Sequence, residues 1–523
     1  MATSIVSPRV LDEFQATRRQ REYGFAIALV TALTVVAVAI GGYHPYAEDG
    51  GLYMAGIKHL LDPALYPRET SFVTEHLRFS LFAPLVAGLT RGLHLRLETV
   101  LLILHVTSFW ATLFAAWLLA VQCFRSRSAR TGAVGLLAVW MTMPIAGTAL
   151  MLMDPYVTAR SVSTPCVLIA LAGALAFFSP SQERDWRGLA WCCGGLATGA
   201  TMHPLMATDA LACVLVLGCV TAVSWRIRVW GTAGLCLAAV GITAGIYRFA
   251  PADGAAYRSV AATRRYWFLS QWQWYEVIGL VAPLLILAAI SFGRRRHGDA
   301  ARVALARMAV ACGATAVVIA ILFARVGSTS YLVARLQPLR VFQLVYVVMI
   351  LMLGAGLAKR VLRRQPLRWF AALLVLGGTM LVAARRTYPD SAHIELPGKT
   401  PSNRWEQAFV WISRNTPEDA LFAMDAHYIS EPGEDAQCFR AIAERSVLPD
   451  YSKDGGEVSI TPSLTEAWER GEKAETGLSR MTDGERMAAL GPLGVTWVVL
   501  NRGAGTGFEC DYANEAVKVC HLP

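Results

Sequence analysis

Charged residues are scarce in this chain of 523 residues, because Asp, Glu, Lys and Arg together make up only 16% of it. A soluble protein of this size carries about a quarter. Hydrophobic residues reach 55%, and the mean hydropathy is +0.42. They gather in runs of nearly membrane-spanning length, which are typical of transmembrane helices. The composition therefore excludes an ordinary soluble fold and predicts a chain that crosses a bilayer many times.

Several short catalytic motifs are also missing. The sequence contains no P-loop, no dinucleotide-binding fingerprint, no GxSxG elbow and no HExxH pair. The glycine-rich segment 503–507 lacks the lysine and the following helix of a phosphate-binding loop. Cysteine or histidine pairs at metal-ligand spacing are absent as well. We therefore expect no metal site of this kind and no certain cofactor, while a divalent cation held by carboxylates stays open.

The net charge is +10, and the pI is about 9.1. In a soluble protein this balance would suggest nucleic-acid binding. Here the arginines form short clusters between apolar runs, as the positive-inside rule describes for cytoplasmic loops. The sequence therefore predicts no nucleic-acid partner and a contact with membrane lipid, whose anionic headgroups suit the same clusters.

Eleven runs are candidate spans. They cover 24–42, 98–122, 131–150, 160–178, 188–204, 208–224, 229–247, 275–292, 303–324, 340–358 and 367–385. Residues 1–23 are polar and the first run has no clear cleavage site, so we expect a retained first helix with its N-terminus in the cytoplasm. This parity puts the basic clusters inside and the C-terminal segment outside. The clusters lie at 125–130, 184–187, 226–228, 294–296 and 359–364.

The first outer loop is predicted to cover residues 43–97. Its apolar stretch Phe79 to Leu93 contains Pro84 and Arg91, and counting it as a span would move every later basic cluster to the wrong face. We therefore place it at the membrane interface. A second amphipathic stretch, Gly51 to Leu61, is expected to form an interfacial helix in the same loop.

Residues 386–523 change in character and predict a small α/β domain outside the cytoplasm. An amphipathic helix is expected at 402–416, buried strands at 420–424 and 495–500, and a terminal hairpin at 508–522. Cys510 and Cys520 flank the predicted hairpin turn and are a disulfide candidate, with Cys438 as an alternative partner for either. The predicted fold class is thus an α-helical polytopic membrane protein, with its transmembrane part at 24–385.

Two adjacent acids, Glu48 and Asp49, follow the first span and precede two glycines and a helix. Asp49 could simply cap that helix. Alternatively, a carboxylate at the membrane edge could act as a general base, with a pKa raised by desolvation toward the working pH. Two acids beside a flexible Gly-Gly exceed what a cap requires. His44 and Tyr53 flank the pair and are expected to bind substrate.

A second acid and several arginines are predicted on the same side. Asp154 and Arg160 lie in the next outer loop, either as an interfacial ion pair or as substrate-binding groups beside the first acids. Arg335 and Arg340 precede a span, where a cation is costly without a partner. A lipid-linked phosphate would be such a partner, and lipid headgroups are the plain alternative.

These features together resemble the C superfamily of glycosyltransferases, in an uncharacterised bacterial branch. The resemblance rests on the N-in first span, the Glu48-Asp49 pair followed by Gly-x-x-Tyr, two interfacial helices and a C-terminal outer domain. It implies sugar transfer, with inversion, from a polyprenyl-phosphate donor to a glycan, lipid or protein acceptor at the outer face of a bacterial inner (plasma) membrane. Carried over, Asp49 is the base, Arg340 holds the donor phosphate and Asp154 is the second-loop acid.

Because members often read Asp-Glu where this chain reads Glu-Asp, Glu48 remains the alternative base. Two other functions stay open. A lipid or glycan transporter, or flippase, would place ionisable groups at mid-membrane, and a non-catalytic assembly protein would leave the loop acids solvated.

Overall fold

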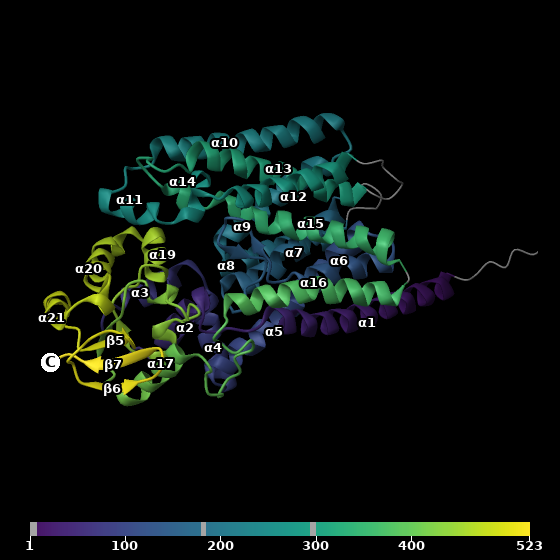
Figure 1. The fold of residues 1–523 in the computed structure, drawn as a ribbon. Coiled ribbons are helices and arrows are strands. Elements are labelled where there is room, and N and C mark those ends of the chain that lie inside the picture. Colours follow the sequence, from purple (N-terminus) through teal and green to yellow (C-terminus); the bar gives the residue numbers. More distant parts are fainter. Residues whose placement is uncertain (1–7, 179–184, 293–299, 364) are drawn as a thin grey trace, which may run out of the picture.

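The computed structural model describes residues 8–178, 185–292, 300–363 and 365–523. A long helical bundle carries a smaller α/β unit at one end (Figure 1). Within these ranges, nine helices are long and apolar enough to cross a membrane. They include α1 (Pro8–Gly41), α5 (Leu97–Cys123), α7 (Ala159–Phe177), α9 (Pro204–Thr221), α10 (Thr232–Phe249), α12 (Trp274–Phe292), α13 (Ala300–Phe323), α15 (Phe342–Leu357) and α16 (Pro366–Thr387).

Two predicted spans are shorter helices. α6 (Arg127–Val139) ends well before residue 150, because a hairpin of β1 (Pro144–Ile145) and β2 (Leu150–Met151) follows it. The second half of the predicted span 131–150 is therefore wrong. α8 (Trp186–Met202) packs closely on α7, where a Cβ added to Gly188 would lie 2.8 Å from the Gly173 carbonyl oxygen. The predicted count of eleven spans stays a prediction.

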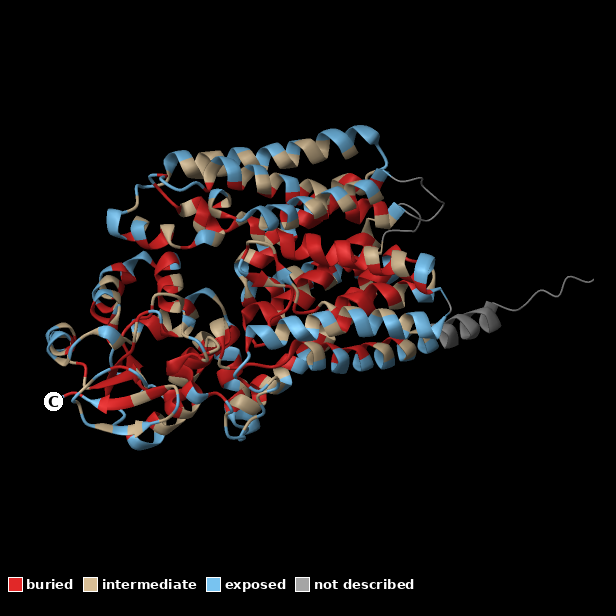
Figure 2. Ribbon diagram, in the orientation of Figure 1, coloured by how far each residue is buried: buried red, intermediate tan, exposed pale blue. Residues whose placement is uncertain are grey.

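Burial divides the bundle into a core and a lipid-facing shell (Figure 2). α15 is buried along most of its length, whereas α10 has no buried residue and α16 only one, Gly377. Exposed apolar side chains such as Leu237, Ile242 and Leu374 cover these outer helices. Such faces suit contact with hydrocarbon rather than water.

The loop 43–97 contains two short helices at the predicted places. α2 (Glu48–Leu61) and α4 (Phe82–Leu93) pack together through Met54, Ile57 and Val86, with α3 (Ser71–Thr74) between them. α4 has 12 residues, which is too short to span a bilayer.

The C-terminal unit is built on a five-stranded sheet of order β4-β3-β5-β7-β6. Its strands are β3 (Leu421–Ala423), β4 (Ser446–Val447), β5 (Trp497–Asn501), β6 (Cys510–Ala513) and β7 (Val517–His521), and its helices are α17 (Arg404–Asn415), α18 (Phe439–Ala443), α19 (Lys453–Ile460), α20 (Thr465–Glu475) and α21 (Asp483–Leu490). Along β5, Trp497 and Val499 enter one core and Val498 and Leu500 the other. Helices thus cover both faces, which explains the continuous apolar run.

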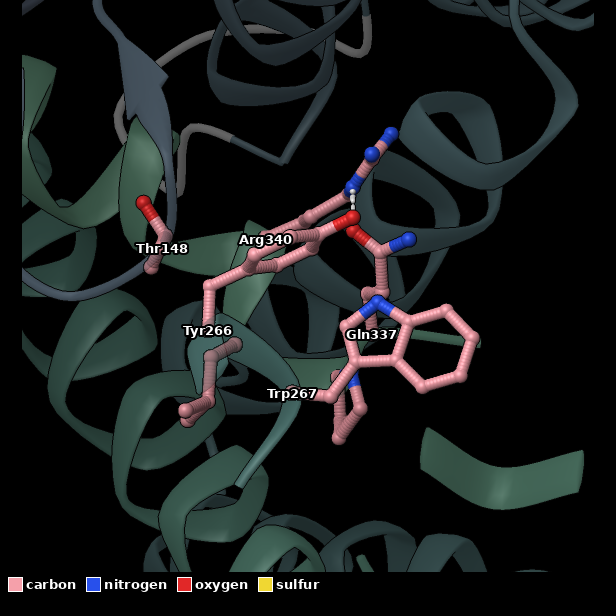
Figure 3. Close-up of a pocket in the computed structure, with 7 residues that line it drawn as sticks. Thr148, Tyr266, Trp267, Gln337 and Arg340 are labelled. Atoms are coloured by element: carbon pink, nitrogen blue, oxygen red, sulfur yellow. Dashed lines mark hydrogen bonds between the residues drawn. The ribbon is translucent and has the colours of Figure 1, made fainter. Parts of the chain in front are cut away.

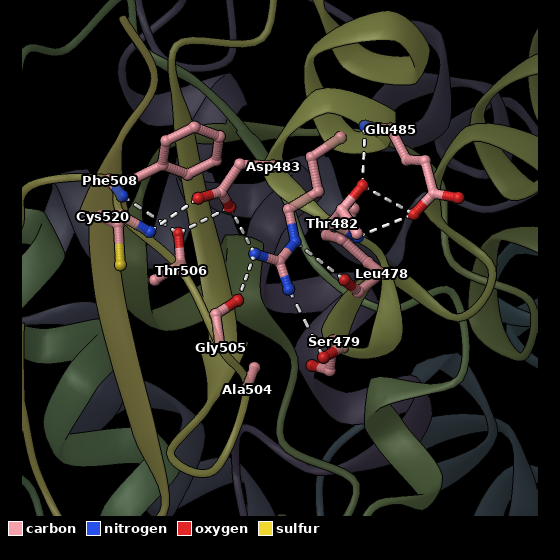
Figure 4. A network of polar contacts seen from close by, with 12 residues as sticks. Leu478, Ser479, Thr482, Asp483, Glu485, Ala504, Gly505, Thr506, Phe508 and Cys520 are labelled. Carbon is pink, nitrogen blue, oxygen red and sulfur yellow. Dashed lines mark hydrogen bonds and ion pairs between the residues drawn. The ribbon is translucent and has the colours of Figure 1, made fainter.

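Two features fix the last part of the C-terminal unit, residues 503–520. A disulfide joins Cys510 to Cys520, while Cys438 is a buried free thiol. The glycine-rich turn 503–507 is held by the fully buried Arg486, whose guanidinium donates to the Gly505 carbonyl at 2.8 Å and to Asp483 at 2.7 Å (Figure 4). This segment is therefore a structural turn.

The ends of the bundle differ in chemistry. At one end Arg127 and Arg130 pair with Glu22 of α1. At the other end, the loop 43–97, the C-terminal unit and α11 (Ala255–Ala262) lie together, with α14 (Leu332–Arg335) nearby (Figure 1). Of the predicted cytoplasmic groups, Arg184, 294–296 and Arg364 lie outside the described residues, as do residues 1–7.

Candidate functional site

The acid pair lies at the start of α2, where the loop 43–97 contacts the C-terminal unit. Isolated β-bridges join Tyr43 to Ile394 and Ala47 to Gln437, and the Glu48 amide donates to the Ala436 carbonyl at 2.9 Å. Glu48 has a φ of +54°, a left-handed conformation that costs free energy for a residue with a side chain. These contacts with the C-terminal unit fix the start of α2.

Neither acid is a helix cap. The cap position is Ala47, no side chain caps the helix, and Asp49 lies inside its first turn. The two glycines are not flexible either, since both are buried. A Cβ on Gly50 would lie 2.7 Å from Tyr156 Cβ, so this glycine lets α2 approach the loop that carries Asp154. The capping alternative for Asp49 is therefore wrong.

Two cationic side chains lie between the three acids Glu48, Asp49 and Asp154. The Lys453 ammonium contacts Glu48 Oε2 and lies 3.3 Å from Asp49 Oδ1. The Arg160 guanidinium lies 3.9 Å from Asp49 Oδ2 and donates to Asp154 Oδ2 at 2.7 Å. A continuous chain of charges, Glu48–Lys453–Asp49–Arg160–Asp154, thus joins the first loop, the second loop and the C-terminal unit.

Exposure separates the roles of these acids. Asp49 keeps 42% of its side chain accessible, whereas Asp154 and Arg160 keep 4% and 8%. Arg160 is the second residue of α7, after the cap residue Thr158, and is held by its buried partner Asp154. Asp154 therefore orients Arg160, whereas Asp49 and Glu48, the latter 36% accessible, are the acids that a substrate can reach.

Charge, rather than burial, sets the ionisation of Asp49. Burial alone would raise the pKa of its carboxyl, but Lys453, Arg160 and Arg340 together lower it below its usual value. The expectation of a raised pKa is therefore wrong for this state, and Asp49 is a carboxylate at neutral pH. Burial acts to lower the pKa of Lys453, yet Glu48 and Asp49 raise it, so Lys453 is charged.

Arg340 lies in the turn Pro338–Val341 before α15, close enough to Asp49 to lower the pKa of that carboxyl. Its Nε donates to Gln337 Oε1 at 2.6 Å, and its NH1 lies 3.4 Å from His203 Nε2. The Tyr266 ring lies beside the Arg340 side chain in a small pocket (Figure 3). No carboxylate lies within ion-pair distance of Arg340 among the described residues, which leaves its guanidinium available to an anion.

Tyr53 follows Asp49 by one helical turn on α2. Its ring packs edge-on against Phe82 and His76. Burial, with a smaller effect of Asp49, raises the pKa of Tyr53 to about 12, so its phenol remains a hydrogen-bond donor.

Two residues that were predicted to bind substrate, His44 and Arg335, make their contacts elsewhere. His44 is buried and its Nδ1 lies 2.8 Å from Glu395 Oε1, at the junction with the C-terminal unit. Arg335 lies 3.7 Å from Asp253 and donates to Tyr257 Oη at 3.1 Å. The structure therefore does not bring either residue to Asp49.

Lys453 was missed by the sequence analysis. It is separated from Asp49 by 404 residues and belongs to no recognisable motif. Only the folded arrangement of the C-terminal unit on the first loop brings it to the acids.

The acids do not form a metal site. In the described part of the chain, no group of three or more His, Cys, Asp or Glu side chains could hold a metal ion. Oxygens of Glu48, Asp49 and Asp154 instead face Lys453 and Arg160. With their oxygens paired to these cationic side chains, the three carboxylates do not fit a divalent cation in this arrangement.

No protein-family model matches the chain, and no curated protein matches its sequence. Among solved structures, the chain is similar to the oligosaccharyltransferase of Archaeoglobus fulgidus in its complex with Zn and sulfate, at 13% sequence identity and a TM-score of 0.47. That match covers 90% of this chain and 68% of the archaeal chain.

Proposed function

We propose that this protein is a membrane glycosyltransferase that moves a sugar from a polyprenyl-phosphate donor to an acceptor hydroxyl at the outer membrane surface. The observation that carries the proposal is Asp49, an accessible carboxylate set between Arg160 and Lys453 at one end of the helical bundle. Catalytic sites concentrate perturbed carboxylates beside specific charges in this way.

The proposed reaction uses Asp49 as general base. The acceptor hydroxyl gives its proton to Asp49, and its oxygen forms a bond to the anomeric carbon of the sugar. The bond from that carbon to the phosphate oxygen breaks, and the polyprenyl phosphate leaves with the electron pair. Attack opposite the leaving group inverts the anomeric centre. General-base assistance of this kind supplies about 10²- to 10⁴-fold in rate.

Arg340 is proposed to hold the donor phosphate. Its guanidinium is a planar fork that matches phosphate oxygens, and Gln337 fixes its Nε at 2.6 Å. The position just before α15 suits a donor whose phosphate lies at the membrane surface while its lipid tail stays in hydrocarbon. Arg160 stays on Asp154 and stabilises the Asp49 carboxylate through space.

The alternatives are less well supported. A transporter or flippase places ionisable groups midway along its spans, whereas Arg160 and Arg340 lie at or just before the starts of α7 and α15. A non-catalytic assembly protein would leave the acids solvated, yet Asp49 is fixed by two cations.

The test is the Arg340→Gln variant, reconstituted in liposomes with a panel of undecaprenyl-phosphate sugars. We expect the donor KM to rise about 10-fold or more, since a charge-assisted hydrogen bond to phosphate is lost. Arg265→Gln is the matched control, because the Arg265 side chain is exposed and its guanidinium donates to the Gln271 carbonyl. An unchanged KM in Arg340→Gln would contradict the role of Arg340.

A further inference from the structure

Lys453 is the first residue of α19 and the one lysine that contacts both acids among the described residues. Only 18% of its side chain is accessible, and its ammonium lies between Glu48 and Asp49. A lysine ammonium has three donors and no acceptor, so it can serve two carboxylates at once. The C-terminal unit therefore supplies a side chain to the proposed site.

The backbone around Lys453 is fixed independently of this ion pair. Arg264 donates to the Ser452 carbonyl at 2.7 Å and to the Tyr451 carbonyl at 2.9 Å. The Asp450 carboxylate accepts from the amide of Lys453 at 2.6 Å. The peptide of Lys453 is thus held by neighbours on both sides, while its ammonium stands at the end of a flexible stem of four methylenes.

Further anchors hold α19 against the outer loops. Tyr257 Oη donates to the Ser459 carbonyl at 2.6 Å. A Cβ on Gly455 would lie 2.9 Å from Arg264 NH2, so the glycine admits the guanidinium that clamps the helix. Releasing the Lys453 side chain therefore need not release α19.

Six charged side chains of the proposed site balance one another before any substrate arrives. Glu48, Asp49 and Asp154 supply three negative charges, and Arg160, Lys453 and Arg340 supply three positive charges. A phosphate bound at Arg340 adds negative charge and makes the centre anionic. Arg160 is paired with the buried Asp154 at 2.7 Å, which leaves Lys453 as the cation whose ammonium stands on a flexible stem.

We propose that Lys453 changes partner when the donor binds, so that its ammonium moves from Glu48 and Asp49 to the donor phosphate. This inference rests on the proposed function. In the free protein the Lys453 ammonium is paired with the Asp49 carboxylate. In the loaded site it joins Arg340 on the phosphate, and Asp49 is left with an open oxygen for the acceptor hydroxyl. Donor binding thereby prepares the base, and the C-terminal unit takes part in both steps.

The electrostatics agree with this exchange. Against burial, which acts to raise it, Lys453 is the first among the cations that lower the pKa of Asp49. Its departure strengthens Asp49 as a base only when the donor is present. Asp49 would thus have a low proton affinity in the empty site and a higher one in the loaded site. This difference would limit proton abstraction by Asp49 before the donor is bound.

The test measures binding of farnesyl phosphate, with farnesol as the probe lacking phosphate, to the full-length protein in nanodiscs. We expect wild type to prefer farnesyl phosphate, Lys453→Met to bind it about 10- to 100-fold more weakly, and Lys453→Arg to retain most of the affinity. Farnesol binding should not change in either variant. Thermal unfolding of each variant reports whether it is folded, and Lys453→Gln serves if the methionine variant is not.

Lys58→Met is the matched control. Lys58 also joins α2 to the C-terminal unit, through Glu444 at 2.6 Å and the Ala441 carbonyl at 2.8 Å, but it does not contact the acid pair. It should bind farnesyl phosphate as wild type does. Equal losses in Lys58→Met and Lys453→Met would overturn the inference, because domain packing alone would then explain both.

The outcomes separate the two proposals. If Arg340→Gln weakens phosphate binding and Lys453→Met does not, the partner exchange is wrong and the proposed function stands. If wild type shows no preference for farnesyl phosphate over farnesol, the proposed donor class itself is wrong.

Discussion

Replacing Asp49 with asparagine removes the proposed base while keeping the shape of the side chain. The rate of transfer should fall about 10²- to 10⁴-fold, which is the usual contribution of a general base. Stability should change little. Asp49 is 42% accessible and its ion-pair distances are 3.3 Å and 3.9 Å, and pairs of this kind contribute about 0–1 kcal/mol to the free energy of unfolding.

The assay follows release of undecaprenyl phosphate from its sugar-linked form in proteoliposomes, together with thermal unfolding of the same preparation. Asp62→Asn is the matched control, because Asp62 ends the same helix and is exposed. It should transfer sugar at the wild-type rate. Full activity in Asp49→Asn, with the fold intact, would refute the role of this carboxylate; Glu48→Gln then tests the neighbouring acid.

Three further predictions follow from the same geometry. Because cations lower the pKa of Asp49 in the empty site, the acidic limb of the kcat/KM profile, which reports the free protein, should lie below the ordinary range of an aspartate, and Lys453→Met should move that limb to higher pH; an unmoved limb would contradict the coupling. Asp154→Ala leaves the buried Arg160 guanidinium without its 2.7 Å partner and should destabilise the protein by about 3–5 kcal/mol in thermal unfolding, far more than Asp49→Asn, and an equal effect would argue against it. Cys510→Ser opens the disulfide of the terminal hairpin and should lower the stability of the C-terminal unit by about 2–3 kcal/mol, with a mobility change on non-reducing gels; a wild-type unfolding curve would argue against a bridge in the native protein.

Hydropathy and charge predicted much of the fold. Apolar runs of spanning length, basic clusters at one end and the parity argument placed Phe79 to Leu93 outside the spans, and α4 is indeed a helix of only 12 residues. The hairpin after α6 was not predicted, because most of its residues are as apolar as those of a span and only Pro144, Gly147 and Thr148 depart from that pattern. Helices α18 to α21 were also missed, since they are short and depend on packing against the sheet.

The candidate site was only partly visible in the sequence. Glu48 and Asp49 stood out because two acids follow an apolar run, and Asp154 and Arg160 because they share one short loop. Lys453 could not be found, since it meets Asp49 only through tertiary packing across 404 residues. The direction of the Asp49 pKa was wrong for the same reason: burial was anticipated, but the number of nearby cations was not.

The central claim is that Asp49 is the general base for sugar transfer from a lipid-linked donor at the membrane surface. It is tested most directly by mass spectrometry of polyprenyl-phosphate sugars in host membranes that lack this protein or carry either the wild type or Asp49→Asn. We predict that one such lipid accumulates in the deletion and in Asp49→Asn and returns to its normal level with wild type. Identical lipid profiles in all three membranes would contradict the account.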